Sequence, residues 1–380
     1  MAASQISIRK HFARLKDPRI NRRKRHLLLD LVVIAVCAVV CGCDTWPKIA
    51  LFARKRRKWL QTFLELPGGA PSHDTFERVF ARLDPEAFQG CFRQWMQALA
   101  ERLGVKQIAI DGKALRGSGQ ASTHLGPLHL VSAWATENHL TLGQVAVAEK
   151  SNEITAIPKL LELLELKGAL VTIDAIGCQK EIARRVVSGG GDYVLTVKDN
   201  QPHLFEDVQQ AFLKALDNDF EGLQHDSYQT KDKGHGRQEA RCYHVIYDPP
   251  GIRDREAWAE LKAIGMCFSE RTVGERTSME VRYFIGSRKA SARTYGKALR
   301  NHWRIENNLH WQLDVTFGED GNRVRERNAA ENLALVRRVA LSLLKQHPGK
   351  QSVACKSLEA ALDTDFLEEI LHAGSDLGTL

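Results

Sequence analysis

The chain has 380 residues, of which 43% are hydrophobic and 26% are charged, as is typical of a soluble globular protein with two or three domains. Its eight cysteines are scattered without a C-x-x-C pair, which excludes a dense disulfide framework and indicates reduced thiols in the cytoplasm. The formal charge of +8 favours a polyanionic partner. Residues 1–58 hold 15 Lys and Arg against 3 Asp and Glu, a net charge of +12, so the remainder sums to −4.

The N-terminal part of the chain begins with a basic arm that is followed by an apolar segment. Leu27–Cys43 follows the arm as the apolar part of a signal or membrane segment would. Asp30 interrupts this segment, and the clean run from Leu31 is too short to span a bilayer, so we expect a buried helix and no membrane association. The basic residues of the arm are expected to contact DNA, and they are Arg22, Arg23, Lys24 and Arg25.

Helical patterns continue to residue 103. An amphipathic stretch near 46–65 carries a basic run at 54–58, which is either a solvated helix face or a phosphate contact. Asp74 is expected to cap the next helix, and Asp84 with Pro85 to start another. Two short helices joined by a tight turn have the form of a helix-turn-helix, although the same residues can simply pack a small helical domain.

From residue 105 the pattern changes to strands that alternate with helices. The order of elements predicts a mixed α/β sheet, antiparallel in its first three strands and parallel in the next. The expected strands are 105–111, 128–135, 140–148, 169–174 and 193–198, with helices from about 153, 178 and 202.

Two of these apolar strands end in an aspartate, Asp111 and Asp174. Ligands collect at the carboxyl ends of parallel strands, so the two carboxylates are expected to face one another if the strands are neighbours. Close carboxylates repel unless a cation lies between them, and Mg²⁺ is a hard cation that takes oxygen ligands. The alternative for Asp174 is a plain cap of the following helix.

A third acid is sought beyond a strand-rich stretch at 217–290. The helical pattern from Tyr295 to Asp314 places His302, Glu306 and His310 on one face. Glu306 is the candidate third ligand; the alternatives are a His-Glu-His transition-metal site and a polar network on a buried helix. The aromatic and apolar residues around it are expected mainly to pack, although one Trp can stack on a base; they are Trp303, Leu309 and Trp311.

Several segments resemble the DDE transposases of bacterial insertion sequences, and most closely the subgroup of the H-repeat-associated proteins. The resemblance covers nearly the whole chain. It is carried by DPRINRRKRHLLLD, PSHDTFERVFARLDPEAF, IAIDGKALRGS, KSNEI, VTIDAIGCQKEIA, YVLTVKDNQP and HWRIENNLHWQLDVTFGEDGNRVRERNAAENLALVRR.

The resemblance implies a ribonuclease-H-like mixed-sheet core, α/β in class, and an acidic triad at Asp111, Asp174 and Glu306. It implies Mg²⁺ as the metal, with Mn²⁺ as a substitute, double-stranded DNA as the partner, and a homodimer on paired element ends. The expected parts are a basic helical DNA-binding domain at 1–103, the first part of the catalytic core at 104–216, a β-rich insertion at 217–290, the rest of the core at 291–350 and a helical tail at 351–380.

The sequence departs from the wider group of relatives around the third acid. Those relatives often have Arg four positions before it and Lys seven after, where this chain has His302 and Leu313. Substitutes for these cations are Arg300, Arg304, Arg323 and Arg325, and alternative acids are Asp314, Glu319 and Asp320. Phosphate contacts are also expected from cations close to the strand ends, unless they are ordinary surface charges; these are Lys113, Arg116 and Lys198.

The expected activity is two-metal cleavage of DNA at the ends of the element, followed by transfer of the 3′-hydroxyl end into target DNA. Two other functions stay open. The chain can be a catalytically silent DNA-binding descendant of a transposase, or a structure-specific nuclease of the same fold.

Overall fold

The computed structural model describes residues 11–20, 24–120, 122, 124–148, 151–234 and 236–373, so Arg22 and Arg23 lie outside the described residues. The chain forms two compact units, each made of separate segments. The first contains residues 1–105, 112–147 and 305–380, and the second contains residues 106–111 and 148–304. The boundary expected at residue 103 lies close to the end of the first of these segments, and the expected domain boundaries stay a prediction.

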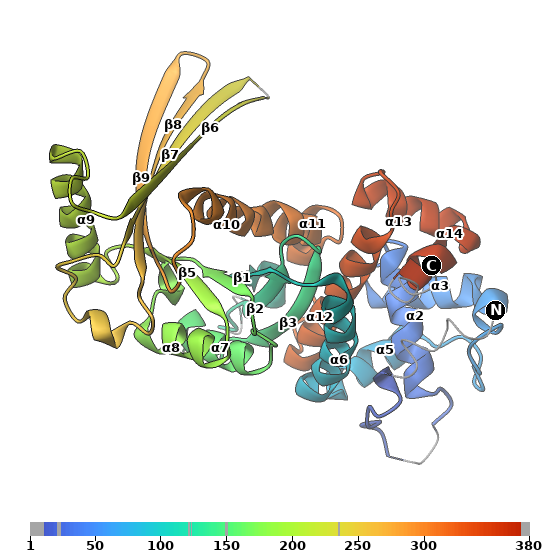
Figure 1. Cartoon of the computed structure of the whole chain (residues 1–380). Helices are drawn as coiled ribbons and strands as arrows, with labels where there is room; N and C mark the ends of the chain where they lie inside the picture. Colours follow the sequence, from blue (N-terminus) through green and yellow to red (C-terminus); the bar gives the residue numbers. More distant parts are fainter. Residues whose placement is uncertain are drawn as a thin grey trace. The chain divides into compact units, whose positions relative to one another are not determined.

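The strands follow the predicted mixed α/β pattern (Figure 1). Their hydrogen-bonded order is β3-β2-β1-β4-β5-β9-β8-β7-β6. β2 pairs antiparallel with β3, whereas β4 pairs parallel with both β1 and β5. The strands are β1 (Gln107–Leu115), β2 (Leu128–Ala135), β3 (Leu140–Ala146), β4 (Leu170–Ile173), β5 (Asp192–Val197), β6 (His225–Gly234), β7 (Arg237–Tyr247), β8 (Ala263–Val273) and β9 (Arg276–Gly286).

In the second unit, helices cover both faces of the strands β4 and β5. Helix α10 (Ala292–Ile305) packs Tyr295 and Leu299 into one apolar cluster with Leu170 and Val194. The opposite face is covered by α7, because Ile157 of this helix and Ile173 of β4 both approach Gly177. The other helices of this unit are α7 (Glu153–Glu162), α8 (Lys180–Ser188) and α9 (Pro202–Asp217).

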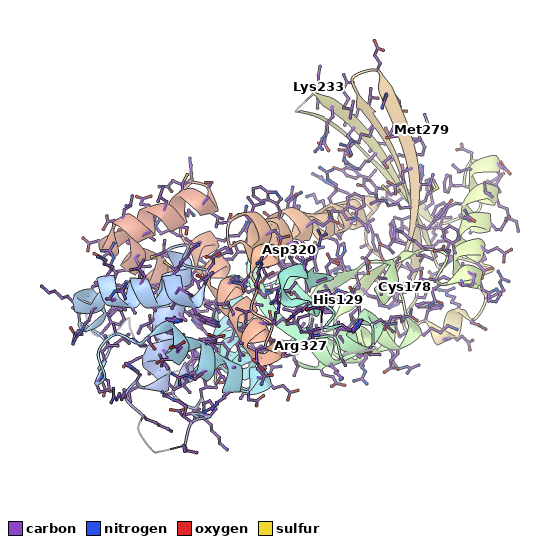
Figure 2. The ribbon with its side chains drawn as sticks, turned by 180° about the vertical axis from the view of Figure 1, so that it is seen from behind. His129, Cys178, Lys233, Met279, Asp320 and Arg327 are labelled. Carbon is purple, nitrogen blue, oxygen red and sulfur yellow. The ribbon has the colours of Figure 1, made fainter. Side chains whose placement is uncertain are left out.

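The strand-rich insertion continues the sheet at β5. β9 pairs antiparallel with β5, with Gly286 opposite Val194, and β8, β7 and β6 follow outward. The stretch at 217–290, expected to be rich in strands, contains these four strands. Figure 2 shows Lys233 and Met279 near the far ends of these long strands, where the Met279 side chain is 66% exposed. The insertion therefore lengthens the core sheet.

The first unit packs its helices around α12. The apolar face of α12 contacts α2, α5, α6 and β3, which explains why the N-terminal helices belong to the same unit as the C-terminal ones. The tail expected as one helix is two, α13 and α14. The helices of this unit are α2 (Leu28–Val40), α3 (Trp46–Lys55), α4 (Arg57–Leu60), α5 (His73–Arg82), α6 (Pro85–Leu103), α11 (Trp311–Val315), α12 (Arg327–Gln346), α13 (Val353–Leu362) and α14 (Thr364–Ala373).

The apolar segment after the basic arm is the buried helix α2. Residues Leu31–Val40 are almost fully buried, and the buried carboxylate of Asp30 accepts a hydrogen bond from the Leu66 N–H at 3.0 Å. Among the helices of the described ranges, none is long and apolar enough to span a membrane. The N-cap of α5 is Ser72, whose Oγ accepts a hydrogen bond from the Thr75 N–H. The expectation that Asp74 caps this helix is therefore wrong. The expected cap at Asp84 is confirmed.

Candidate active site

Asp111 and Asp174 lie at the same edge of the sheet in the second unit. The parallel register of β1 and β4 pairs Ile110 with Ile173, and an aspartate follows each of these residues. Asp174 comes directly after β4, whereas Asp111 lies in the middle of β1, which continues to Leu115 and does not end at residue 111 as expected. Because side chains alternate along a strand, both aspartates belong to the face that also carries Thr172. The two strands are neighbours, so the condition set for the two carboxylates to lie at one edge is met.

The electrostatic setting of Asp174 is that of a carboxylate partly removed from water. Burial raises the pKa of Asp174, the nearby carboxylate of Glu153 raises it further, and Lys198 opposes this shift. Hydrogen bonds from the backbone N–H groups of Ile176 and Gly177 also oppose it, as for a residue at the N-cap of the 3₁₀ turn Ala175–Gly177. The following helix α8 has Gln179, and not Asp174, as its N-cap.

Glu153 was singled out in the sequence only as a helix start, yet its charge acts on Asp174. Its side chain lies in the first turn of α7, after the N-cap Asn152. The available signal was its place in the segment KSNEI, which is one of the segments that carry the family resemblance. Glu153 therefore adds negative charge to that of the two aspartates at this edge.

Helix α10 lies on the face of the sheet that Asp111 and Asp174 share. The amide of Gln107 donates to the Ala298 carbonyl oxygen at 2.8 Å, and His302 Nδ1 is 3.1 Å from Thr172 Oγ1. Burial lowers the pKa of His302 to about 4, so the imidazole is neutral at neutral pH. His302 therefore anchors the helix to the sheet.

Glu306 opens a π-helical turn, Glu306–His310, that follows α10 directly. Its side chain is exposed, whereas His302 is buried, so the expected shared face of His302, Glu306 and His310 is interrupted. A π-turn holds one more residue than an α-turn, and π-turns are frequent at functional sites. Within the described ranges, no three His, Cys, Asp or Glu side chains are grouped as a ready metal site.

Lys113 has a structural role in place of the phosphate contact expected for it. Its side chain is 7% exposed, and Nζ lies 2.6 Å from Asp314 Oδ1 and 2.9 Å from Asp320 Oδ1. Its charge is therefore neutralised by two carboxylates of the first unit.

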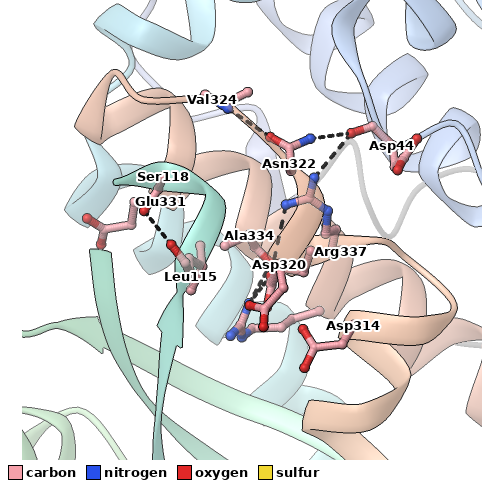
Figure 3. A network of polar contacts seen from close by, with 12 residues as sticks. Asp44, Leu115, Ser118, Asp314, Asp320, Asn322, Val324, Glu331, Ala334 and Arg337 are labelled. Atoms are coloured by element: carbon pink, nitrogen blue, oxygen red, sulfur yellow. Dashed lines mark hydrogen bonds and ion pairs between the residues drawn. The ribbon is translucent and has the colours of Figure 1, made fainter. Parts of the chain in front are cut away.

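The three alternative acids are held by cations in the same network. The buried Glu319 carboxylate accepts from Arg338 Nη1 at 2.9 Å, and Asp314 and Asp320 bind Lys113. Figure 3 draws Asp314, Asp320 and Arg337 among the residues of this network, and the Arg337 guanidinium donates to the Asp44 carbonyl oxygen at 3.1 Å. Because these acids neutralise buried cations, Glu306 is the acid of this region that is left for a site.

The remaining predicted cations have different settings. Arg116 is 83% exposed with Asp320 at 3.5 Å, Lys198 and Arg304 are exposed, and Lys24 lies 3.3 Å from Asp17. Among the substitutes, Arg300 pairs with Asp232 at 3.2 Å, and Arg323 and Arg325 are exposed.

The aromatic residues around Glu306 do not all pack as expected. Trp303 lies under the Arg282 guanidinium, which is 4.3 Å from the ring centroid, and Leu309 is buried. Trp311 is 52% exposed, so the expectation that it serves mainly in packing is wrong.

Comparisons with known protein families match both the N-terminal helical part and the remainder of the chain. Residues 105–343 match the family described as "Transposase DDE domain", and residues 9–96 match the one described as "DDE_Tnp_1-associated". Among similar proteins, "Putative transposase YncI" of Escherichia coli O157:H7 is 40% identical, over 96% of this chain and 94% of that protein. "H repeat-associated putative transposase YhhI" of Escherichia coli K12 is 38% identical, over 97% and 98% of the two chains.

A solved structure gives a weaker similarity. It is the piggyBac transposase synaptic complex with hairpin DNA, which aligns over 99% of this chain and 79% of that one with a TM-score of 0.38 and 8% identity.

Proposed function

We propose that this chain, which belongs to the family of transposases with a DDE domain and a ribonuclease-H-like core, cuts DNA at the ends of an insertion sequence. We propose further that it joins the 3′-hydroxyl end to target DNA. The observation that carries this proposal is the parallel register of β1 and β4, which brings Asp111 and Asp174 to one edge. Two carboxylates at the point where the parallel pairing of adjacent strands ends form the site expected for a phosphate substrate and its metal.

The course of α10 supports Glu306 as the third carboxylate. From Ala298 to His302 the helix advances by one turn, while its contacts advance from Gln107 to Thr172, the register partner of Ala109. One helical turn and two strand residues are each about 5–7 Å long, so helix and strand run alongside one another. Helix α10 therefore runs toward the edge of the sheet that carries Asp111, and Glu306 is the first residue after this helix.

The residues of this edge fit a hard divalent cation, because their donors are carboxylate oxygens. Asp111, Asp174 and Glu306 would hold Mg²⁺, with Mn²⁺ as a substitute, and the bound metal would supply an activated water or 3′-hydroxyl and a charge that stabilises the leaving oxygen. Lys198 lies close enough to Asp174 to lower its pKa, and its charge would favour a phosphate at the same edge. No covalent intermediate with the protein is needed.

The decisive experiment compares the wild-type chain with Asp111→Asn and Asp174→Asn on supercoiled DNA that carries the sequences flanking the gene. We expect Mg²⁺-dependent nicked and joined products from the wild type and a loss of on the order of a thousandfold or more in the variants, with DNA binding retained. Asp217→Asn, an exposed change at the end of α9, is the matched control and should act as the wild type does.

The same experiment separates the three candidate functions. Joined products support transposition, cleavage without joining supports a structure-specific nuclease, and binding alone supports a silent DNA-binding protein. The last has a precedent, because a 29% identical relative over 72 residues is named "Inactive transposase YbfQ". Normal cleavage by Asp111→Asn would contradict the assignment of the carboxylates. We further propose a dimer on paired ends, which light scattering of the DNA complex tests.

A further inference from the structure

A basic pocket of about 620 Å³ lies within the N-terminal part of the first unit. Its walls come from the segment before α2, the turn before α5, and α5 itself. The lining residues are Arg19, Ile20, Lys24, Arg25, His26, Gly68, Ala70, Ser72, Thr75, Arg78, Val79 and Arg82.

The charge of this pocket is one-sided. Five of its lining residues are Lys or Arg, and none is Asp or Glu. Asp17 is the carboxylate that approaches the pocket's cations, at 2.8 Å from Arg19 Nη2 and 3.3 Å from Lys24 Nζ. In the part of the chain that the structure describes, Arg25, Arg78 and Arg82 have no carboxylate within 4.0 Å. These exposed guanidinium groups therefore present unneutralised positive charge to an anion.

Backbone contacts hold the pocket in shape without a ligand. Arg19 Nη2 donates to the His26 carbonyl oxygen at 2.7 Å, and Arg78 Nε donates to the Asp74 carbonyl oxygen at 3.0 Å. Gly68 packs so closely on the opposite wall that a Cβ there would lie 2.3 Å from the Arg25 carbonyl oxygen. These contacts orient two guanidinium groups and the chain around the cavity before any partner binds.

We propose that this pocket binds a phosphodiester group of the DNA backbone. The proposal rests on the proposed function, since it assumes that the chain binds DNA. Arginine forks match phosphate oxygens in geometry and charge, and the N-terminus of the ten-residue helix α5 adds backbone N–H groups at the same cavity. Contacts to phosphate position the DNA and carry no sequence information directly, so we expect the pocket to bind duplexes of different sequence alike.

The other basic run of this unit is less suited to the same role. Arg56 donates to the carbonyl oxygens of Ala361 and Leu362 at the end of α13, so it serves in part to join two helices. Its neighbours lie on an exposed helix face and line neither this pocket nor the smaller one beside Trp311. The cations of the pocket therefore surround one cavity, whereas those of the run at 54–58 are spread over an exposed helix face.

The test measures the affinity of the full chain for two labelled duplexes over a range of salt concentrations. One duplex carries the sequence that flanks the gene, and the other is a scrambled sequence of the same composition. We expect Arg78→Gln/Arg82→Gln to weaken binding of both duplexes on the order of tenfold or more, and to make the salt slope shallower by about 1–2. Gly68→Ala, which changes the wall and not the charge, should also weaken both.

The matched control is Lys167→Gln/Lys214→Gln, which removes the same charge from exposed positions of the second unit. Thermal unfolding with circular dichroism shows that each variant is folded. Unchanged affinity and slope in the pocket variants overturn the proposal, and so does an equal loss in the control. Stabilisation of the wild type by inorganic phosphate, together with unchanged DNA affinity in the variants, would assign the pocket to free phosphate and overturn it as well.

Cleavage is scored separately from binding. If the wild type binds DNA through the pocket and does not cut it, the pocket proposal stands while the proposed activity fails. If the wild type cuts and joins DNA and the pocket variants bind normally, the activity stands and the pocket proposal fails.

Discussion

At the scale of single residues, carboxylates that are partly removed from water occur at more than one place. Asp174 is such a residue at the candidate site, and Glu331 is one in α12, where burial and the charges of Glu86 and Asp84 raise its pKa to about 7. The first belongs to the chemistry that we propose. The second has no place in it, and so its effect on stability can be measured without disturbing the site.

Glu331 makes a prediction about pH. Its folded-state pKa of about 7 lies above its ordinary value of 4.5, so the native state binds more protons between these values and loses stability as the pH rises through them. Glu331→Gln should raise the free energy of unfolding at pH 8 by on the order of 1–2 kcal/mol and leave it nearly unchanged at pH 4. Urea unfolding at both pH values checks this, with the exposed Glu77→Gln as control. An equal effect at both pH values would contradict it.

At the scale of elements, the position of α10 on the sheet decides where the chain leads after it. Tyr295 is buried against β9, and its hydroxyl donates to the Arg288 carbonyl oxygen at 2.5 Å. Gly286 of β9 leaves the space that this ring fills, because a Cβ there would be 2.2 Å from Tyr295 Oη. The lack of a side chain at Gly286 of β9 therefore determines how closely α10 packs on the strands.

We expect Gly286→Ala to push α10 away from the sheet. The overpacking should lower the free energy of unfolding by about 1–3 kcal/mol and reduce cleavage more than it reduces DNA binding, because α10 precedes Glu306. Denaturant unfolding and the cleavage assay measure the two effects. Gly234→Ala is the control, since no atom lies within 4 Å of a Cβ at the end of β6. Equal stability of both variants would show that the ring can move aside.

At the scale of the whole molecule, the N-terminal helices and the C-terminal helices share one core in the first unit. Helix α2 is buried almost along its entire length, and α12 is one of its main partners. The segment expected to be an independent domain at 1–103 therefore lacks half of its core when it stands alone.

A fragment of residues 1–103 should not unfold cooperatively. Exposure of the apolar surface of α2 removes the main gain from folding, so the fragment should show weak near-ultraviolet circular dichroism and a broad thermal transition. The full chain under the same conditions is the control. A sharp transition in the fragment would mean that these helices form a core without α12.

The features of the fold and the site that could be predicted from the sequence are those whose pattern lies within a short segment of the chain. Asp111 and Asp174 each end an apolar run, but the sequence left open whether their strands are neighbours, which the register of β1 and β4 shows. The role of Lys113 could not be predicted, because its partners Asp314 and Asp320 are about two hundred residues further along the chain. The face shared by His302 and His310 was misjudged because the count assumed α-helical spacing throughout.

The π-turn after α10 also changes how this chain should be compared with its relatives. Position 313, where many relatives have a lysine seven residues after the acid, is here a fully buried leucine. Because the turn takes up one extra residue, the outward position passes to Asp314, which holds Lys113. A count from Glu306 that keeps α-helical spacing therefore ends at a core position of this chain. The absence of a lysine at position 313 therefore reflects the shift in helical register at the π-turn as well as a change of charge.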